Sequence, residues 1–414
     1  MATIKKRGES YCIRVSNGFD QNGKEIRVTM TYRPKAKSPK AIEKEVAKAA
    51  ALFEEEVRNG SYVSGDKMKF SDYVKVWWDS WAVSHLSTRT ASDYKALIER
   101  HALPLWCNLP ITKIKAQHVQ DLIDDLNKGH APTTVHKIIV AIDSVMRYAY
   151  KMEVIRENPV KRCELPRIAK DDDLHYFTPE QARQFLEAIG EEYTITYKRK
   201  SGKTWEQSFN MSTQMQVFFY LALYSGCRRG ELLALTWNDI LFDEGKITIT
   251  KATERLRTGE QKIKCPKTAA GKRDLRLPRK CFELLRRWHI EQQQLSMSLG
   301  ADWMGTRGKD FDKNFVFIQM INGLQMHTDT PYQCMKRFIE RYNKTVPEEK
   351  RLPIIRLHDL RHTSATLLLS EGMDIEEVSR RLGHAKASTT LDIYGHALPE
   401  KDDEAAGILE QLLG

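Results

Sequence analysis

The most informative part of the sequence is the stretch HDLRHTSATLLLSEGMDIEEVSRRLGHAKASTTLDIY, residues 358–394. His358 and Arg361 stand three residues apart in it, so on a helix they face the same side. His384 follows Leu382-Gly383, a pair typical of the end of a helix, and Tyr394 comes ten residues later. We therefore expect polar side chains from this stretch to meet at one site.

A second motif, SGCRRGEL at residues 225–232, places an arginine near the start of a helix. Arg228 follows the break at Gly226, and a helix N-terminus favours anions, as the arginine itself does. Arg229 is the alternative arginine in this motif. Glu231 lies in the expected first turn, where the helix dipole favours a carboxylate even without a functional role.

A third motif is Pro266-Lys267-Thr268, in a basic segment before the strand expected at residues 273–277. We expect this segment to form a β-hairpin turn that presents Lys267. Lys264 and Lys272 flank it, so charge alone does not single out one lysine. A lysine here is also typical of a solvated basic loop.

These residue types suit cleavage of a phosphodiester. In-line attack puts negative charge on the nonbridging oxygens, so an enzyme without a metal ion needs several fixed cations around one phosphate. An arginine is always charged and can hold two oxygens at once, which makes Arg228 and Arg361 candidates. His358 could donate to the phosphate or accept a proton. A phenol with a pKa of about 10 can both attack and leave, which suits Tyr394 as the nucleophile.

In their order and spacing these motifs resemble those of the tyrosine recombinase (phage integrase) family, and especially the integrases of phages and conjugative transposons. The resemblance implies a site-specific DNA recombinase that forms a 3′-phosphotyrosine and integrates and excises a mobile element, without cofactor, metal or ATP. The catalytic residues that it implies are Arg228, Lys267, His358, Arg361, His384 and Tyr394. By the same analogy Lys267 is the general acid for the leaving 5′ oxygen, and Glu231 supports the first arginine or the histidine.

The resemblance also implies partners. They are double-stranded DNA with core and arm attachment sites, further copies of the chain in a homotetramer on DNA, and an excisionase or host DNA-bending protein. The alternatives within reach are a chromosome-dimer resolvase, a type IB topoisomerase with the same phosphotyrosine chemistry, and a non-catalytic DNA-binding protein on the same scaffold. The last would lack Tyr394 or one of the arginines, and all are present.

Isolated residues of these types have ordinary structural interpretations: a half-buried aromatic for Tyr394, a helix-terminal histidine for His384. The co-occurrence of the motifs favours the catalytic interpretation. His362 follows His358 by four residues, a spacing found in metal sites, but the glutamate of HExxH is absent and Arg361 lies between them. We therefore expect no metal site there.

Hydrophobic periodicity predicts a multidomain chain. Residues 1–66 are predicted to form an arm-type DNA-binding domain of a three-stranded sheet and a helix that begins at Ser38-Pro39 and ends before Gly60. Residues 67–165 are predicted to form an all-α core-binding domain, whose last helix runs from Thr133 to Lys151 and is ended by Asn158-Pro159. Residues 174–414 are predicted to form a mainly helical α+β catalytic domain, with strands at 246–250, 273–277 and 315–318. Two segments, 193–209 and 295–312, are interpreted as insertions or loops, and 405–413 as an amphipathic helix.

Composition limits the remaining classes. The 66 Lys and Arg against 55 Asp and Glu give a net charge of +11, which favours a polyanionic partner. Seven scattered cysteines without a CxxC pair argue against a disulfide framework and a zinc module. No apolar run is long enough to span a bilayer, and Met1–Arg7 lacks the apolar stretch of a signal peptide. We expect a cytoplasmic, nucleoid-associated bacterial protein.

Overall fold

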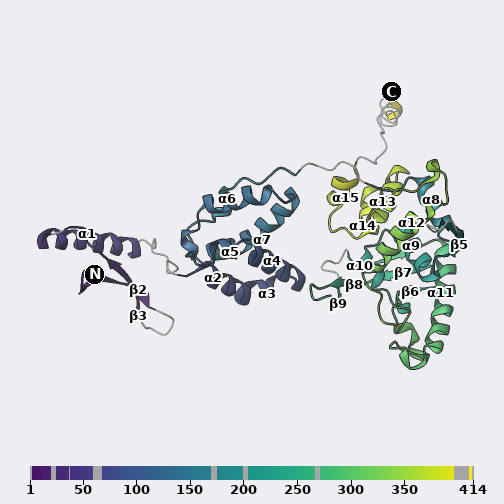
Figure 1. Cartoon of the computed structure of the whole chain (residues 1–414), viewed down its shortest axis with the longest axis horizontal. Coiled ribbons are helices and arrows are strands. Elements are labelled where there is room, and N and C mark those ends of the chain that lie inside the picture. Colours follow the sequence, from purple (N-terminus) through teal and green to yellow (C-terminus); the bar gives the residue numbers. More distant parts are fainter. Residues whose placement is uncertain are drawn as a thin grey trace. The chain divides into compact units, whose positions relative to one another are not determined.

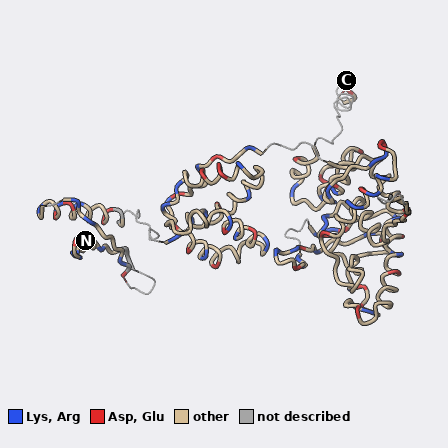
Figure 2. The backbone as a smooth tube through the Cα atoms, viewed as in Figure 1, with Lys and Arg blue, Asp and Glu red and all other residues tan. Residues whose placement is uncertain are grey.

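The structure is a computed structural model that describes residues 2–19, 25–36, 38–58, 68–168, 175–198, 204–265, 271–395 and 410–412. The chain divides into two compact units, Met1–Lys170 and Asp171–Gly414 (Figure 1). Lys and Arg residues are spread over both units and are not gathered in one of them (Figure 2). In the described residues, no helix is both long and apolar enough to cross a membrane.

The first unit opens with a three-stranded antiparallel sheet in the order β1-β2-β3, formed by β1 (Thr3–Arg7), β2 (Ser10–Phe19) and β3 (Glu25–Tyr32). The helix α1 (Pro39–Arg58) packs on it through Phe53 and Val57, which meet Ile13 and Val15. The predicted sheet and helix are confirmed. Gly60 and most of the linker that follows lie outside the described residues.

The rest of the first unit is helical, as predicted. Its elements are α2 (Phe70–Trp77), a π-helical turn (Trp78–Ala82), α3 (Val83–His85), α4 (Thr88–His101), α5 (Leu103–Trp106), a 3-10 turn (Ile111–Lys113), α6 (Ala116–Asn127) and α7 (Pro132–Lys151). Trp77 and Ile142 lie in its fully buried core. The helix predicted from Thr133 to Lys151 is confirmed by α7. Asn158-Pro159 does not end it, because α7 stops at Lys151 and Asn158 caps a separate 3-10 turn (Pro159–Arg162) by accepting from the Val160 amide.

The second unit combines helices with a small antiparallel sheet in the order β10-β7-β6, as predicted for an α+β domain. Its elements up to the sheet are α8 (Pro179–Ala188), β4 (Tyr193–Lys198), β5 (Thr204–Phe209), α9 (Thr213–Ser225), α10 (Arg229–Leu233), a 3-10 turn (Trp237–Asp239), β6 (Ile240–Leu241), β7 (Lys246–Ile249), β8 (Ala252–Arg255), β9 (Gln261–Lys264) and β10 (Arg273–Arg276). The remaining elements are α11 (Arg279–Ser298), α12 (Thr330–Tyr342), α13 (Asp359–Ser370), α14 (Ile375–Leu382), α15 (Ala387–Tyr394), and 3-10 turns at Gly300–Asp302, Gly308–Lys313 and Glu348–Lys350.

Three predictions for this unit are corrected. Residues 315–318 form no strand, because their backbone groups bond to scattered partners: the Val316 amide to the Leu235 carbonyl and the Ile318 amide to the Gln214 side chain. The segment 193–209 contains the antiparallel hairpin β4–β5, whose Tyr193 stacks on Phe209 and lies against Phe338 of α12.

The segment 295–312 is not a loop either. Its first residues, through Ser298, complete α11, and two 3-10 turns follow. Trp303 and Phe311 stack on each other at 6.4 Å and join the main core. Large apolar side chains therefore anchor this segment in the core, even though its sequence is rich in glycine and in charged residues.

The last three helices α13, α14 and α15 pack against one another (Figure 1). They share a small buried cluster that is separate from the main core of the second unit. Its members are Ala365, Leu369, Val378, Leu382 and Tyr394, and we call it the tyrosine cluster. The C-terminal helix predicted at 405–413 lies outside the described residues except for a helical turn at 410–412.

Candidate active site

Arg228 lies at the N-terminal end of α10, as its motif predicts. Its backbone amide and its Nη1 donate to the two carboxylate oxygens of Glu231, both at 3.0 Å. Its guanidinium also lies 3.4 Å from the Gly383 carbonyl, at the end of α14. Glu231 is buried, while the Arg228 side chain is 44% exposed, so the carboxylate fixes an arginine that still reaches solvent.

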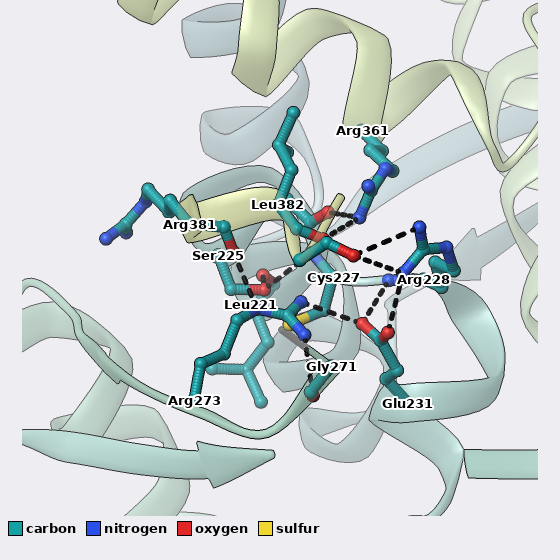
Figure 3. Close-up of polar contacts among 12 residues, drawn as sticks. Leu221, Ser225, Cys227, Arg228, Glu231, Gly271, Arg273, Arg361, Arg381 and Leu382 are labelled. Atoms are coloured by element: carbon teal, nitrogen blue, oxygen red, sulfur yellow. Dashed lines mark hydrogen bonds and ion pairs between the residues drawn. The ribbon is translucent and has the colours of Figure 1, made fainter. Parts of the chain in front are cut away.

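Arg273 completes a buried network beneath Arg228 (Figure 3). Its Nη2 donates to Glu231 at 2.8 Å, and its Nε donates to the Arg381 carbonyl at 2.7 Å. It also donates to the carbonyl of Gly271, beside the segment 266–270. Burial alone would raise the pKa of Glu231, but the charges and hydrogen bonds of Arg273 and Arg228 outweigh it and lower that pKa. The carboxylate is therefore ionised between two guanidinium groups.

The sequence interpretation did not include Arg273. The sequence did contain a signal that Arg273 is buried. Side chains of a strand point alternately to its two faces, and Arg273, Leu275 and Leu277 share one face while the residues between them are exposed. Leu275 and Leu277 are buried, so the arginine that shares their face had to be buried and paired.

Arg361 is the second predicted arginine, and it is 2% exposed. Its Nη1 donates to the carbonyls of Gly226 and Leu382, both at 2.8 Å (Figure 3). Its Nη2 is buried and has no hydrogen-bond partner among the described residues. Burial, together with the nearby charge of Arg228, lowers the pKa of Arg361 to about 10, so the group is still a cation at neutral pH.

Gly226 makes this arrangement possible. It adopts a left-handed conformation with φ of +63° at the end of α9. A Cβ atom at this position would lie 2.7 Å from a methyl group of Leu382. The bare backbone therefore lets α9 and α14 approach closely enough for Arg361 to bond to both.

Two of the predicted histidines lie beside these arginines. His384 follows α14, and its Nδ1 lies 2.8 Å from the Thr390 hydroxyl. His358 precedes α13. Burial and neighbouring arginines lower the pKa of His384 to about 4, and burial with the His362 ring lowers the pKa of His358 to about 4. Both rings are therefore neutral at neutral pH.

Tyr394 is the last residue of α15 and is 1% exposed. Burial raises the pKa of its phenol, although the positive charges of Arg361 and Arg228 oppose this shift. Its hydroxyl lies 2.8 Å from Nδ1 of His362, a residue that the sequence interpretation considered only as a metal ligand. The structure thus places Tyr394 near both arginines, and adds His362 to the site.

Lys267 lies outside the described residues. The predicted hairpin turn at 266–268 lies there too. The strand before it, β9, pairs with β8, and Lys264 of β9 is paired with Glu254 at 2.7 Å.

Comparisons with known proteins identify the family. The profile of the Phage integrase family matches residues 176–401, more than half of the chain, and that of the Phage integrase central domain matches 70–165. The chain belongs to the phage integrase family. It is a tyrosine site-specific recombinase, an integrase of the kind that mobile elements carry, and its fold is an N-terminal sheet, a helical core-binding domain and an α+β catalytic domain.

Individual relatives are moderately similar over long ranges. The ICEBs1 integrase of Bacillus subtilis (strain 168) is 27% identical and covers 100% of both chains. The prophage integrase IntR of Escherichia coli (strain K12) is 24% identical over 97% of this chain and 99% of its own. The structure of the Tn1549 transposon integrase in complex with transposon right end DNA is 22% identical, with a TM-score of 0.63 over 84% of this chain and 100% of that one. A lambda integrase tetramer bound to a Holliday junction has a TM-score of 0.51 at 15% identity and covers 96% of each chain.

Proposed function

We propose that this integrase cuts and rejoins DNA through a 3′-phosphotyrosine at Tyr394, so that a mobile element is integrated and excised. Arg228 and Arg361 bind the nonbridging oxygens of the scissile phosphate. Both guanidinium groups converge on the end of α14, where Arg361 bonds to the Leu382 carbonyl and Arg228 lies against that of Gly383. A phosphate bound by the two guanidinium groups at the end of α14 lies beside His384, which follows Gly383 in the sequence.

The observation that carries the proposal is the state of Arg361. One of its terminal nitrogens is fixed by two carbonyls, whereas Nη2 is a buried charged donor without a partner in the described residues. A buried donor of this kind costs free energy unless something accepts from it. A phosphate oxygen supplies such an acceptor, and the bond strengthens as negative charge grows in the transition state.

The other site residues take the following roles. Lys267 protonates the leaving 5′ oxygen from the segment that ends at Gly271, whose carbonyl is bonded to Arg273. His384 and His358 donate to phosphate oxygens as neutral rings. Glu231 is a supporting residue, because it bonds to both the backbone and the side chain of Arg228.

We further propose the domain roles. Residues 1–66 bind arm sites, residues 67–165 bind core sites, and residues 174–414 carry out catalysis. Four copies assemble on two double-stranded attachment sites in the bacterial cytoplasm, with an excisionase or a host DNA-bending protein to set direction. The net charge of +11 supports binding to a polyanion of this size.

Replacing Tyr394 by Phe tests the proposal. The variant should bind the attachment site but form no covalent adduct with a suicide DNA substrate on a denaturing gel, because it lacks the attacking oxygen. Tyr224→Phe is the matched control, since this tyrosine lies on α9 outside the site and its loss should leave the adduct yield unchanged. An adduct of wild-type yield from Tyr394→Phe would mean that another residue is the nucleophile.

A further inference from the structure

The phenol of Tyr394 and the ring of His362 form a buried pair. The two groups are 2.8 Å apart, and only 1% of Tyr394 and 9% of His362 are exposed. His362 belongs to the second turn of α13, and Tyr394 closes α15, so the hydrogen bond joins two helices of the tyrosine cluster. The ring nitrogen that forms a hydrogen bond with the Tyr394 hydroxyl is therefore Nδ1 of His362.

His358 is the alternative acceptor, but its place in the structure differs. Its ring stands edge-on to the His362 ring, with centroids 5.0 Å apart and an interplanar angle of 89°. In the described part of the chain no hydrogen bond joins His358 to Tyr394. The hydrogen bond to the phenol comes from the histidine four residues further along.

We propose that His362, rather than His358, accepts the proton of Tyr394 when the DNA is cut. The inference rests on the proposed role of Tyr394 as nucleophile. In this step the phenolic O–H bond breaks and its proton passes to Nδ1 of His362 while the Tyr394 oxygen bonds to phosphorus. The P–O5′ bond breaks and the leaving oxygen takes a proton from the general acid. On rejoining, the imidazolium returns its proton to the phenolate.

The surroundings of His362 suit a neutral acceptor. Burial lowers its pKa, and the charges of Arg356 and Arg361 act in the same direction. Asp359 opposes them, but its carboxylate already accepts from the backbone and the side chain of Arg356. The ring of His358 lies on one side, and Tyr394 is the group that α15 contributes. A neutral ring that accepts at Nδ1 carries its own proton on Nε2.

The direct test is His362→Asn with His358→Asn as the matched control. The amide oxygen of Asn takes about the place of Nδ1, so it can hold the phenol but cannot take its proton. Adduct formation is followed in single turnover on DNA with 5′-bridging sulfur, where the leaving group needs no proton, over roughly pH 5 to 9, the range in which histidine titrates. For the wild type we expect the rate to rise with pH and level off once His362 is neutral.

His362→Asn should be slower by roughly 10²–10⁴-fold and should lose this plateau, because a positioned base contributes that much. His358→Asn should be slower but keep the same pH dependence. Wild-type rates from His362→Asn, or a pH dependence lost only in His358→Asn, would overturn the proposal. If wild type forms no adduct, or Tyr394→Phe still does, the nucleophile itself is wrong.

A second measurement excludes misfolding as the cause. A fluorinated tyrosine at position 394 is a stronger acid and depends less on a base. It should restore a large part of the rate in His362→Asn and change wild type little. A misfolded variant would not recover, and absence of recovery in a variant that still binds DNA would contradict the assignment of His362.

Discussion

The two sides of the active site are built differently. On one side, Arg228, Glu231 and Arg273 form an ion network, which we call the anion wall, on elements that belong to the main core of the second unit. On the other side, Tyr394 is packed in the five-residue tyrosine cluster. Arg361 connects them, because its Nη1 bonds to Gly226 on the first side and to Leu382 on the second. The charges are thus held by a large core, whereas the nucleophile depends on a small one, which we expect to open at a lower free energy.

The largest effect should come from replacing Lys267, the proposed general acid. Lys267→Ala should cleave ordinary DNA roughly 10²–10⁴-fold more slowly, because expulsion of an alkoxide needs a proton. It should approach wild-type rates on DNA with 5′-bridging sulfur, whose thiolate leaves unaided. The measurement is single-turnover adduct formation on the two substrates.

Lys264→Ala and Lys272→Ala are the controls for this experiment. Lys264 is paired with Glu254, and both lysines should show only salt-sensitive losses of DNA binding. Rescue by sulfur in one of these variants, with Lys267→Ala still slow, would move the general acid to a different lysine.

The next effect is on stability, and it tests how firmly the anion wall is held. Glu231→Gln leaves Arg273 buried without its charge partner, so the free energy of unfolding should fall by about 3 kcal/mol. Since the folded state lowers the pKa of Glu231 below its ordinary 4.5, this contribution is present above pH 4.5 and is lost as the pH falls through the folded-state value. The difference from wild type in urea unfolding should therefore shrink in acid.

Glu254→Gln is the control for the stability measurement. Its partner Lys264 is 40% exposed, so the change should cost less than about 1 kcal/mol. If Glu231→Gln and Glu254→Gln lowered the free energy of unfolding equally, the buried network would contribute no more to stability than a surface ion pair.

A smaller effect, on the rate of adduct formation, should distinguish the tyrosine cluster from the main core. Leu369 belongs to the tyrosine cluster and Leu285 to the main core, and both are fully buried. Each Leu→Ala change should destabilise the protein by roughly 2–5 kcal/mol. Where both variants remain folded, we expect Leu369→Ala to slow adduct formation at saturating DNA by about tenfold, because the cluster that places Tyr394 loosens. Leu285→Ala should stay close to wild type, and equal losses would remove the distinction.

The smallest effect should come from chelation. If Arg228, Arg361 and Lys267 supply the positive charge around the phosphate, excess EDTA should leave the cleavage rate unchanged. Loss of cleavage that Mg²⁺ or Zn²⁺ restores would show that side chains alone do not neutralise the phosphate.

The sequence predicted the elements whose signals are local. Capping chemistry predicted the start of α1 at Ser38-Pro39, and the break at Gly226 predicted the end of α9. The hairpin β4–β5 was missed because its alternating apolar residues are few and its surroundings polar. The prediction of a strand at 315–318 was wrong, because a run of apolar residues does not show whether another strand lies beside it to form hydrogen bonds.

For the site, the motifs identified Arg228, Glu231, Arg361, His384 and Tyr394, and the structure brings them together. The alternation along β10 could indicate that Arg273 is buried, but the partners of Arg273 and His362 required the structure, because they lie 42 and 32 residues away in the sequence. Spacing on one helix could indicate that His362 shares a face with His358. It could not indicate which of the two rings meets a tyrosine from another helix.

Gly226 has a practical consequence for anyone who retargets this recombinase by directed evolution. We expect a library that randomises its codon to contain many weakened members, because a Cβ there would lie 2.7 Å from a Leu382 methyl group and the φ of +63° disfavours every other residue, while the Gly226 carbonyl has to stay where Arg361 bonds to it. Changes in DNA preference should instead be sought among exposed residues, with this codon held fixed. The size of a useful library is thus set partly by a residue that has no side chain.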